Sequence, residues 1–107
     1  MENRVVITGL GAITPIGNNV NEFWTNAKKG VCGIDEITLF DASDYKVKIA
    51  GEVKNFKAED FIDKKEAKRL DRFTHFALAA TEEAMKDAKL DLKDENVDPN
   101  RVGVIVG

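Results

Sequence analysis

The stretch Val5-Val6-Ile7-Thr8-Gly9-Leu10-Gly11 decides the fold class of this 107-residue chain. Residues Val5–Gly9 form a β-branched apolar run without polar alternation, which is typical of a strand covered on both faces in an α/β protein. A second run of this kind, Val102–Val106, lies near the other end of the chain. Helical sequence long enough to cross over separates the two runs. We therefore predict that both are strands of one parallel sheet.

Composition narrows the class of protein further. The chain has 16 Lys and Arg against 19 Asp and Glu, a formal charge of −3, a pI near 5.2 and a single Cys. This balance predicts no nucleic acid or membrane as partner, and the length suffices for one domain at most. One Cys forms no internal disulfide, and no Cys/His cluster has zinc spacing. With no leader or apolar span near the N-terminus, we expect a cytoplasmic protein without structural metal or cofactor.

Capping residues predict where the first helix begins. Asn19 with Glu22 three residues later has the form of a capping box, and cations followed by Gly30 mark the end of a helix near Lys29. Residues 31–44 are predicted to be irregular. Residues 46–53 alternate loosely enough for a strand or extended segment at a sheet edge.

A long helical region follows. Residues 58–90 contain neither Pro nor Gly, which indicates two or three helices. Asp63 with Glu66 forms one N-terminal signature, and Asp71 is a second cap before a longer helix over residues 72–89. That longer helix has a narrow face rich in small residues, which permits close packing. The face consists of Phe73, Phe76, Ala77, Ala80, Ala84 and Ala88.

Three features that could carry chemistry are weak. Gly9 and Gly11 begin a dinucleotide-binding fingerprint, but its third glycine would fall at Thr14, so nucleotide binding is disfavoured. Cys32 has no His or helix N-terminus beside it to lower its thiol pKa, and it is interpreted as a small, partly buried structural thiol. His75 has no carboxylate partner in sequence and is interpreted as packed or surface-exposed rather than catalytic. No Ser-His-Asp triad can be assembled.

A charge pattern is more specific. On a helix turning about 100° per residue, with Lys64 at zero, Lys68 lies at about 40°, Lys65 at about 100° and Arg69 at about 140°. The segment 64–72 holds five cations and two anions, a net +3 within a chain of net −3. A basic arc on an acidic protein favours attraction to one acidic surface. On charge patterning alone, a solvated helix face remains the stronger alternative.

Several of these residues together also resemble a known family. The opening strand motif is followed by other matching segments in register over all 107 residues, namely Thr14-Pro15-Ile16-Gly17, Phe23-Trp24, Gly33-Ile34, Ala50-Gly51, Lys64–Arg72 and Val102–Gly107. The chain resembles the first quarter of a β-ketoacyl-acyl carrier protein synthase, with synthase II of bacterial fatty acid synthesis as the most similar type. The combination of the strand motif with the basic helix favours the fatty-acid type over polyketide synthases.

The resemblance implies a fold and an activity. The expected fold is the N-terminal part of a thiolase-like α-β-α layered fold, a mostly parallel sheet with helical crossovers. Residues 1–107 would be an N-terminal fragment of the first thiolase-like half, without a complete second domain. The family is homodimeric, transfers an acyl group to a cysteine and condenses it with malonyl carrier protein after decarboxylation. Neither Cys32 nor His75 matches the family's catalytic Cys/His/His, so no catalytic residue is assigned, and the chain alone is expected to be inactive.

One function of the family maps onto this chain residue by residue. The positions that match its basic docking patch for acyl carrier protein are Lys64, Lys65, Lys68 and Arg69. With this resemblance, docking becomes favoured over the solvated-face interpretation. A free-standing α/β binding module that holds an acidic protein through its basic helix is the alternative.

Overall fold

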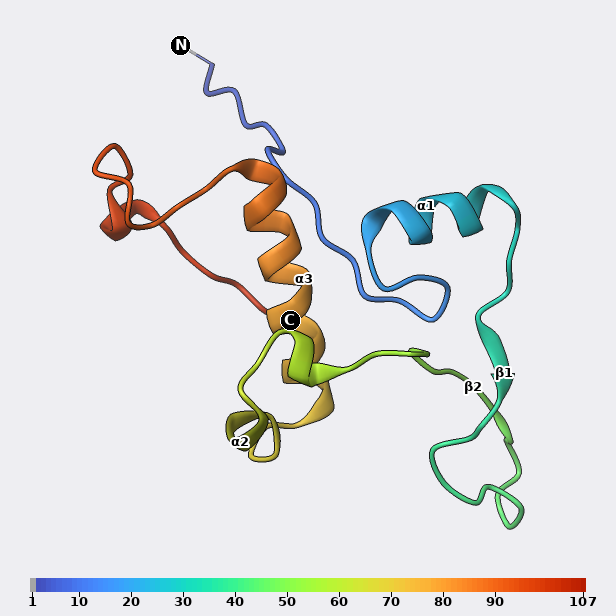
Figure 1. Cartoon of the computed structure of the whole chain (residues 1–107). Coiled ribbons are helices and arrows are strands. Elements are labelled where there is room, and N and C mark those ends of the chain that lie inside the picture. Colours follow the sequence, from blue (N-terminus) through green and yellow to red (C-terminus); the bar gives the residue numbers. More distant parts are fainter. Residues whose placement is uncertain (1) are drawn as a thin grey trace.

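The computed structural model describes residues 2–107 and is elongated, with a two-stranded sheet at one end (Figure 1). Its elements are α1 (Val20–Lys28), β1 (Ile34–Glu36), β2 (Ile49–Gly51), the 3₁₀ turn η1 (Ala58–Asp60), α2 (Lys64–Ala67), α3 (Arg72–Ala88) and the 3₁₀ turn η2 (Pro99–Arg101).

The N-terminal segment packs directly on the backbone of α3. A Cβ atom added to Gly9 would lie 2.6 Å from the backbone nitrogen of Ala88 and 2.8 Å from its Cβ, and one added to Gly11 would lie 2.8 Å from the carbonyl carbon of Ala80. The predicted small-residue face of the long helix is therefore confirmed, and it receives the glycine segment. The space that a phosphate would need beside these glycines is filled by the helix.

Two carboxylates of α3 hold this packing by hydrogen bonds. The side chain of Glu83 accepts from the backbone N–H of Ala12 at 3.0 Å and from that of Val20 at 2.8 Å. Asp87 accepts from the N–H of Leu10 at 3.0 Å. Because Val20 is the first residue of α1, Glu83 joins the N-terminal segment, α1 and α3 at one point. Figure 1 shows the N-terminal segment running between these two helices.

The capping predictions for α1 are confirmed with one difference. The side chain of Asn19 accepts from the backbone N–H of Glu22 at 2.8 Å, as expected for the N-cap. The Glu22 carboxylate accepts from the N–H of Asn18 at 2.8 Å, one residue before the predicted partner. At the other end, α1 stops at Lys28, and Gly30 takes a positive φ of 70°. Glycine adopts this conformation at little steric cost, which explains the stop.

The predicted parallel sheet is absent from residues 2–107. Residues 5–9 and 102–106 lie outside every strand, and the sheet that does form pairs β1 with β2 antiparallel, with Asp35 opposite Ala50. A strand needs a neighbour for its backbone groups. In this chain the Leu10 N–H binds Asp87 instead of a strand. Strand β2 lies inside the predicted segment 46–53, whereas β1 falls where irregular structure was expected.

A carboxylate beside β2 binds the start of residues 37–48, the segment between β1 and β2, which we call the arm. Glu52, next to β2, accepts hydrogen bonds from the Thr38 side chain at 2.7 Å and from the Thr38 N–H at 3.0 Å. These hydrogen bonds, the side-chain one first, hold the pKa of Glu52 below its ordinary value.

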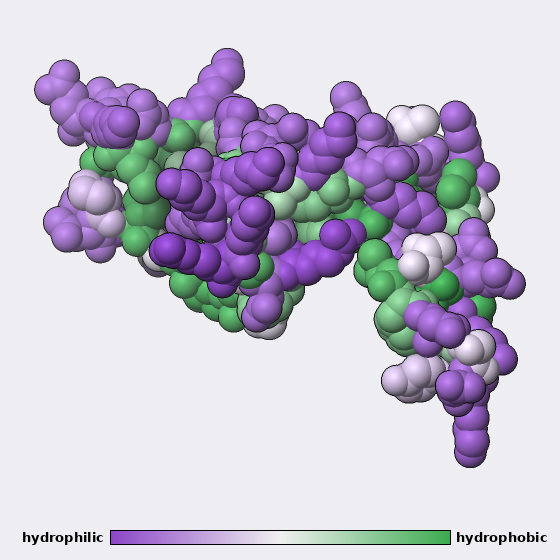
Figure 2. Space-filling view, turned by 60° about the horizontal axis from the view of Figure 1, so that its bottom comes forward, coloured by the Kyte–Doolittle hydropathy of each residue, from purple (hydrophilic) through white to green (hydrophobic). Residues whose placement is uncertain are grey.

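Little of the chain is buried. The buried apolar residues among 2–107 are Ala42, Ile62, Ala67 and Ala79, whereas Val5 is 93% exposed and Ile105 is 99% exposed. The radius of gyration is 17.3 Å, compared with about 13 Å for a compact domain of this length. Figure 2 shows apolar surface breaking through the polar surface in several places. Both predicted core strands thus present their apolar side chains to solvent.

This exposure predicts the behaviour of the isolated chain. Because apolar runs at both ends lack a cover, the 107-residue chain should self-associate or melt without cooperativity. Analytical ultracentrifugation and thermal circular dichroism measure both properties. A monomer with a sharp melting transition would contradict the expectation.

The close approach to α3 predicts a second result. Gly11→Ala places a methyl group against the backbone of Ala80 and should lower the amide-exchange protection of Leu10 and Ala12 in this chain. The matched control is Gly103→Ala, because a Cβ there meets nothing within 4 Å. Equal protection in the two variants would show that the glycine packing does not hold the segment.

Candidate docking surface

The basic residues singled out in sequence surround one short helix. Helix α2 begins at Lys64 because the side chain of Asp63 accepts from the Lys65 N–H at 3.1 Å. A helical hydrogen bond runs from the Ala67 N–H to the Asp63 carbonyl at 2.8 Å. The N-terminal signature predicted for this helix is therefore confirmed at Asp63.

The helix is shorter than the predicted arc requires. Lys68 is its C-cap and keeps a helical conformation, with φ −68° and ψ −18°. Beyond it, the Arg69 N–H bonds to the Glu66 carbonyl at 2.9 Å, a tighter turn than an α-helix makes. Lys64, Lys65 and Lys68 thus follow helical geometry, whereas Arg69 lies in the turn that follows.

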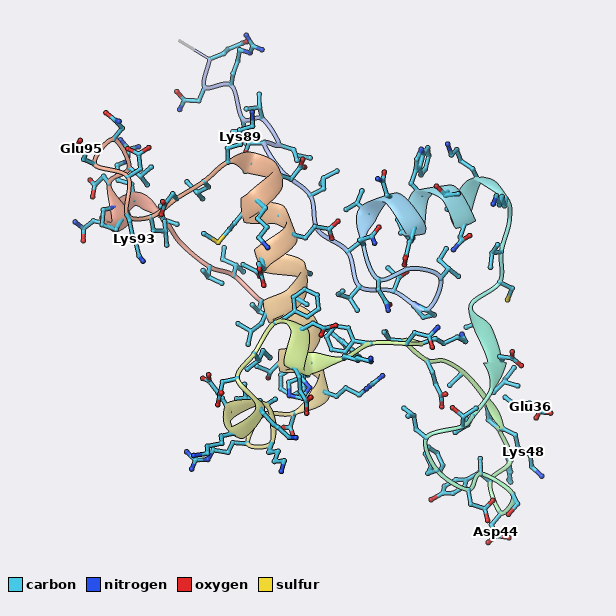
Figure 3. The ribbon with its side chains drawn as sticks, in the orientation of Figure 1. Glu36, Asp44, Lys48, Lys89, Lys93 and Glu95 are labelled. Carbon is cyan, nitrogen blue, oxygen red and sulfur yellow. The ribbon has the colours of Figure 1, made fainter. Side chains whose placement is uncertain are left out.

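Two buried side chains anchor this basic segment to the body. Ile62 precedes the helix and Ala67 ends it, and each is 8% exposed. The four predicted docking residues lie between and just after these anchors, and all four are exposed. Figure 3 shows nitrogen-tipped side chains projecting outward from α2. Burial of the anchors therefore turns the charged side chains toward solvent.

One ion pair within 4.0 Å is found among residues 2–107. It joins Lys86 to Glu82 on α3 and involves none of the four predicted docking residues. The fifth cation of the segment differs. The guanidinium of Arg72 donates to the Val53 carbonyl at 3.0 Å and lies 4.9 Å from the centre of the Phe76 ring. Four cations, Lys64, Lys65, Lys68 and Arg69, thus form an exposed group, which we call the basic surface.

The residue that sequence reasoning undervalued is His75. Its Nε2 atom lies 2.8 Å from the carbonyl oxygen of Ala67, and this contact joins α3 to the end of α2. The residue is half-buried. This agrees with the interpretation of a packed histidine. No sequence signal marks the contact, because the two residues meet only once α2 folds against α3.

Cys32 lies away from any such arrangement. The expected partial burial is wrong: Cys32 is exposed, because the segment between α1 and β1 has no helix or strand of residues 2–107 packed over it, and its thiol faces the Ile34 carbonyl at 3.7 Å. Within residues 2–107, no group of three or more His, Cys, Asp and Glu side chains is arranged to hold a metal ion. None of the helices in the same range has the length and apolar character needed to cross a membrane.

Comparison with known proteins identifies the class. The family model described as "Beta-ketoacyl synthase, N-terminal domain" matches residues 2–107. The chain therefore belongs to the beta-ketoacyl synthase family.

Individual relatives make the relationship more specific. The chain is 59% identical over 104 residues to 3-oxoacyl-[acyl-carrier-protein] synthase 2 of Staphylococcus aureus (strain N315), covering 97% of this chain and 25% of that protein. It is 52% identical over 106 residues to the protein of the same name from Synechocystis sp., again 25% of its length. The chain thus spans one quarter of these relatives.

A solved structure supports the fold. The ishigamide ketosynthase/chain length factor matches with a TM-score of 0.74 and 32% sequence identity over 83% of this chain and 22% of that one. The resemblance to ketosynthases noted in the sequence is therefore confirmed. The small mixed α/β unit seen here is similar to part of a ketosynthase structure.

Proposed function

We propose that this chain is the N-terminal part, within the first thiolase-like half, of a 3-oxoacyl-[acyl carrier protein] synthase II, and that its basic surface docks acyl carrier protein. The whole enzyme, a cytoplasmic homodimer, would elongate fatty acids by decarboxylative condensation of an acyl thioester with malonyl carrier protein. Identity of 59% to a synthase 2 over 97% of the chain supports the enzyme class.

The basic surface is the observation that carries the docking role. Its four cations are exposed, and no carboxylate in residues 2–107 lies within ion-pair distance of them. Exposed ion pairs are worth only about 0–1 kcal/mol each, so docking through this surface is expected to be weak. Several such pairs speed encounter with an acidic partner and orient it, and they weaken as salt is added. A transient, salt-sensitive complex is what a carrier protein that must leave after each reaction requires.

The chemical step is assigned elsewhere in the enzyme. Acyl transfer needs a thiolate activated by a helix N-terminus or a neighbouring base, together with donors that stabilise the oxyanion. Cys32 is exposed in the segment between α1 and β1, and Nε2 of His75 is hydrogen-bonded to the Ala67 carbonyl. This chain would supply docking and part of the scaffold, and by itself it would be inactive.

Charge reversal on the basic surface tests the docking role. In the full-length enzyme (the family-length protein), Lys68→Glu combined with Arg69→Glu should raise the Kd for acyl carrier protein about tenfold or more at low salt, because two attractions become repulsions. The difference should shrink as ionic strength rises. Activity on a free acyl thioester should persist.

The control reverses the same amount of charge at another place. Lys46 and Lys48 are exposed, and Figure 3 shows Lys48 on the arm at the sheet end of the molecule, away from α2. Lys46→Glu with Lys48→Glu should leave the Kd nearly unchanged. Equal effects of the two pairs, or none from the first pair at low salt, would refute the docking role.

A substitution at the cysteine tests the division of labour. Cys32→Ser removes the one thiol of this chain without disturbing a buried contact. The condensation rate of the family-length protein should therefore stay within about twofold of the parent rate, as is usual for exposed positions without a special role. Loss of the acyl-enzyme intermediate in this variant would contradict the assignment of the nucleophile to another segment.

A further inference from the structure

The hydrogen bond between His75 and Ala67 is the one direct side-chain link from α3 to the end of α2 in the hydrogen bonds of residues 2–107. We propose that His75 is a positioning residue for the basic surface: its Nε2–H holds the Ala67 carbonyl and thereby sets the geometry in which the four cations meet an acidic partner. This inference rests on the proposed docking function.

Helix α2 cannot hold this geometry by itself. It contains four residues, and a single turn has too few hydrogen bonds to offset the cost of ordering its backbone. The carbonyl groups at its end need partners from outside the helix. The Leu70 N–H reaches the Ala67 carbonyl only at 3.4 Å, whereas His75 Nε2 lies at 2.8 Å.

The direction of this hydrogen bond is fixed by chemistry. A carbonyl oxygen only accepts, so Nε2 of His75 carries the hydrogen and donates it. The ring has two side-chain torsions and extends from the first turn of α3, where the His75 N–H bonds to the Asp71 carbonyl at 3.2 Å. Phe76, the next residue along the helix, packs its ring edge-on against Phe56 at 5.1 Å between centres. The donor is therefore presented from a well-anchored turn.

The position of Ala67 makes the bond matter for docking. Lys64 and Lys65 precede this residue and Lys68 and Arg69 follow it, so a shift at Ala67 moves both pairs of charges. Releasing its carbonyl would let the segment sample several arrangements. A partner would then have to select one of them, which lowers affinity without changing the charge.

Three substitutions separate the donor from the ring and its volume. His75→Gln keeps an N–H donor the same number of bonds from Cα as Nε2. His75→Asn brings its donor one bond shorter, and His75→Phe keeps a ring without a donor. In the family-length protein, the Asn and Phe variants should raise the Kd and the KM for acyl carrier protein about three- to tenfold, the loss of one net hydrogen bond. His75→Gln should restore both values to within about twofold, inside the spread expected for a retained bond.

A purely structural role would behave differently. In the Asn and Phe variants, kcat on a free acyl thioester should stay at the parent value, because the enzyme's reacting groups and charges are unaltered. The melting temperature should fall by no more than about 2–4 °C, the effect of one lost hydrogen bond. Lower affinity in His75→Gln, parent affinity in His75→Phe, or global unfolding of both the Asn and the Phe variants would each overturn the proposal.

The charge-reversal pair from the docking test is measured in parallel. If Lys68→Glu with Arg69→Glu weakens carrier binding while His75→Phe does not, docking stands and the positioning role of His75 fails. If charge reversal has no effect at low salt, the docking function itself fails, and the inference about His75 fails with it.

Discussion

The N-terminal segment, α1 and α3 are held together through the close approach of a backbone segment to a helix. Gly9 and Gly11 lie against the Ala-rich face of α3, where any Cβ would meet helix backbone. Glu83 then satisfies the N–H groups of Ala12 and Val20 with its two oxygens. One helix thereby fixes the path of the N-terminal segment and the start of α1. Without side chains between them, backbone and helix reach a contact that larger residues forbid.

The same helix organises the basic surface from its other end. The first turn of α3 carries Arg72, which binds the Val53 carbonyl, and His75, which binds the Ala67 carbonyl. The 17-residue helix α3 therefore supports the four-residue helix α2. This division suits the proposed transient docking: the charges stay in water, where they act over distance, and their backbone is held by neutral contacts beneath them.

Some of the structure could be read directly from sequence because it depends on neighbours along the chain. The N-caps Asn19 and Asp63 and the stop at Gly30 are local, as is the small-residue face of α3. The exposed cations of the basic surface were likewise found from spacing. The parallel sheet was not obtained, because residues 5–9 and 102–106 find no strand neighbours within residues 2–107. A β-branched run states a preference for burial, and only a partner strand turns it into sheet.

Sequence alone thus determined the helices, the side-chain caps at Asn19 and Asp63 and the position of the positive charge, since each follows from residue type and short-range spacing. The family came from a resemblance over the whole chain, and Asp71, the other predicted cap, begins α3 without a side-chain cap hydrogen bond. Tertiary structure decided which charges remain free and which are engaged. Arg72 belongs to the same basic run as Arg69, yet it is bound to Val53 and lies over Phe76. His75 found its partner eight residues away. These outcomes depend on how α2 and the segment after β2 pack on α3. A sequence pattern does not show which residues this packing brings into contact.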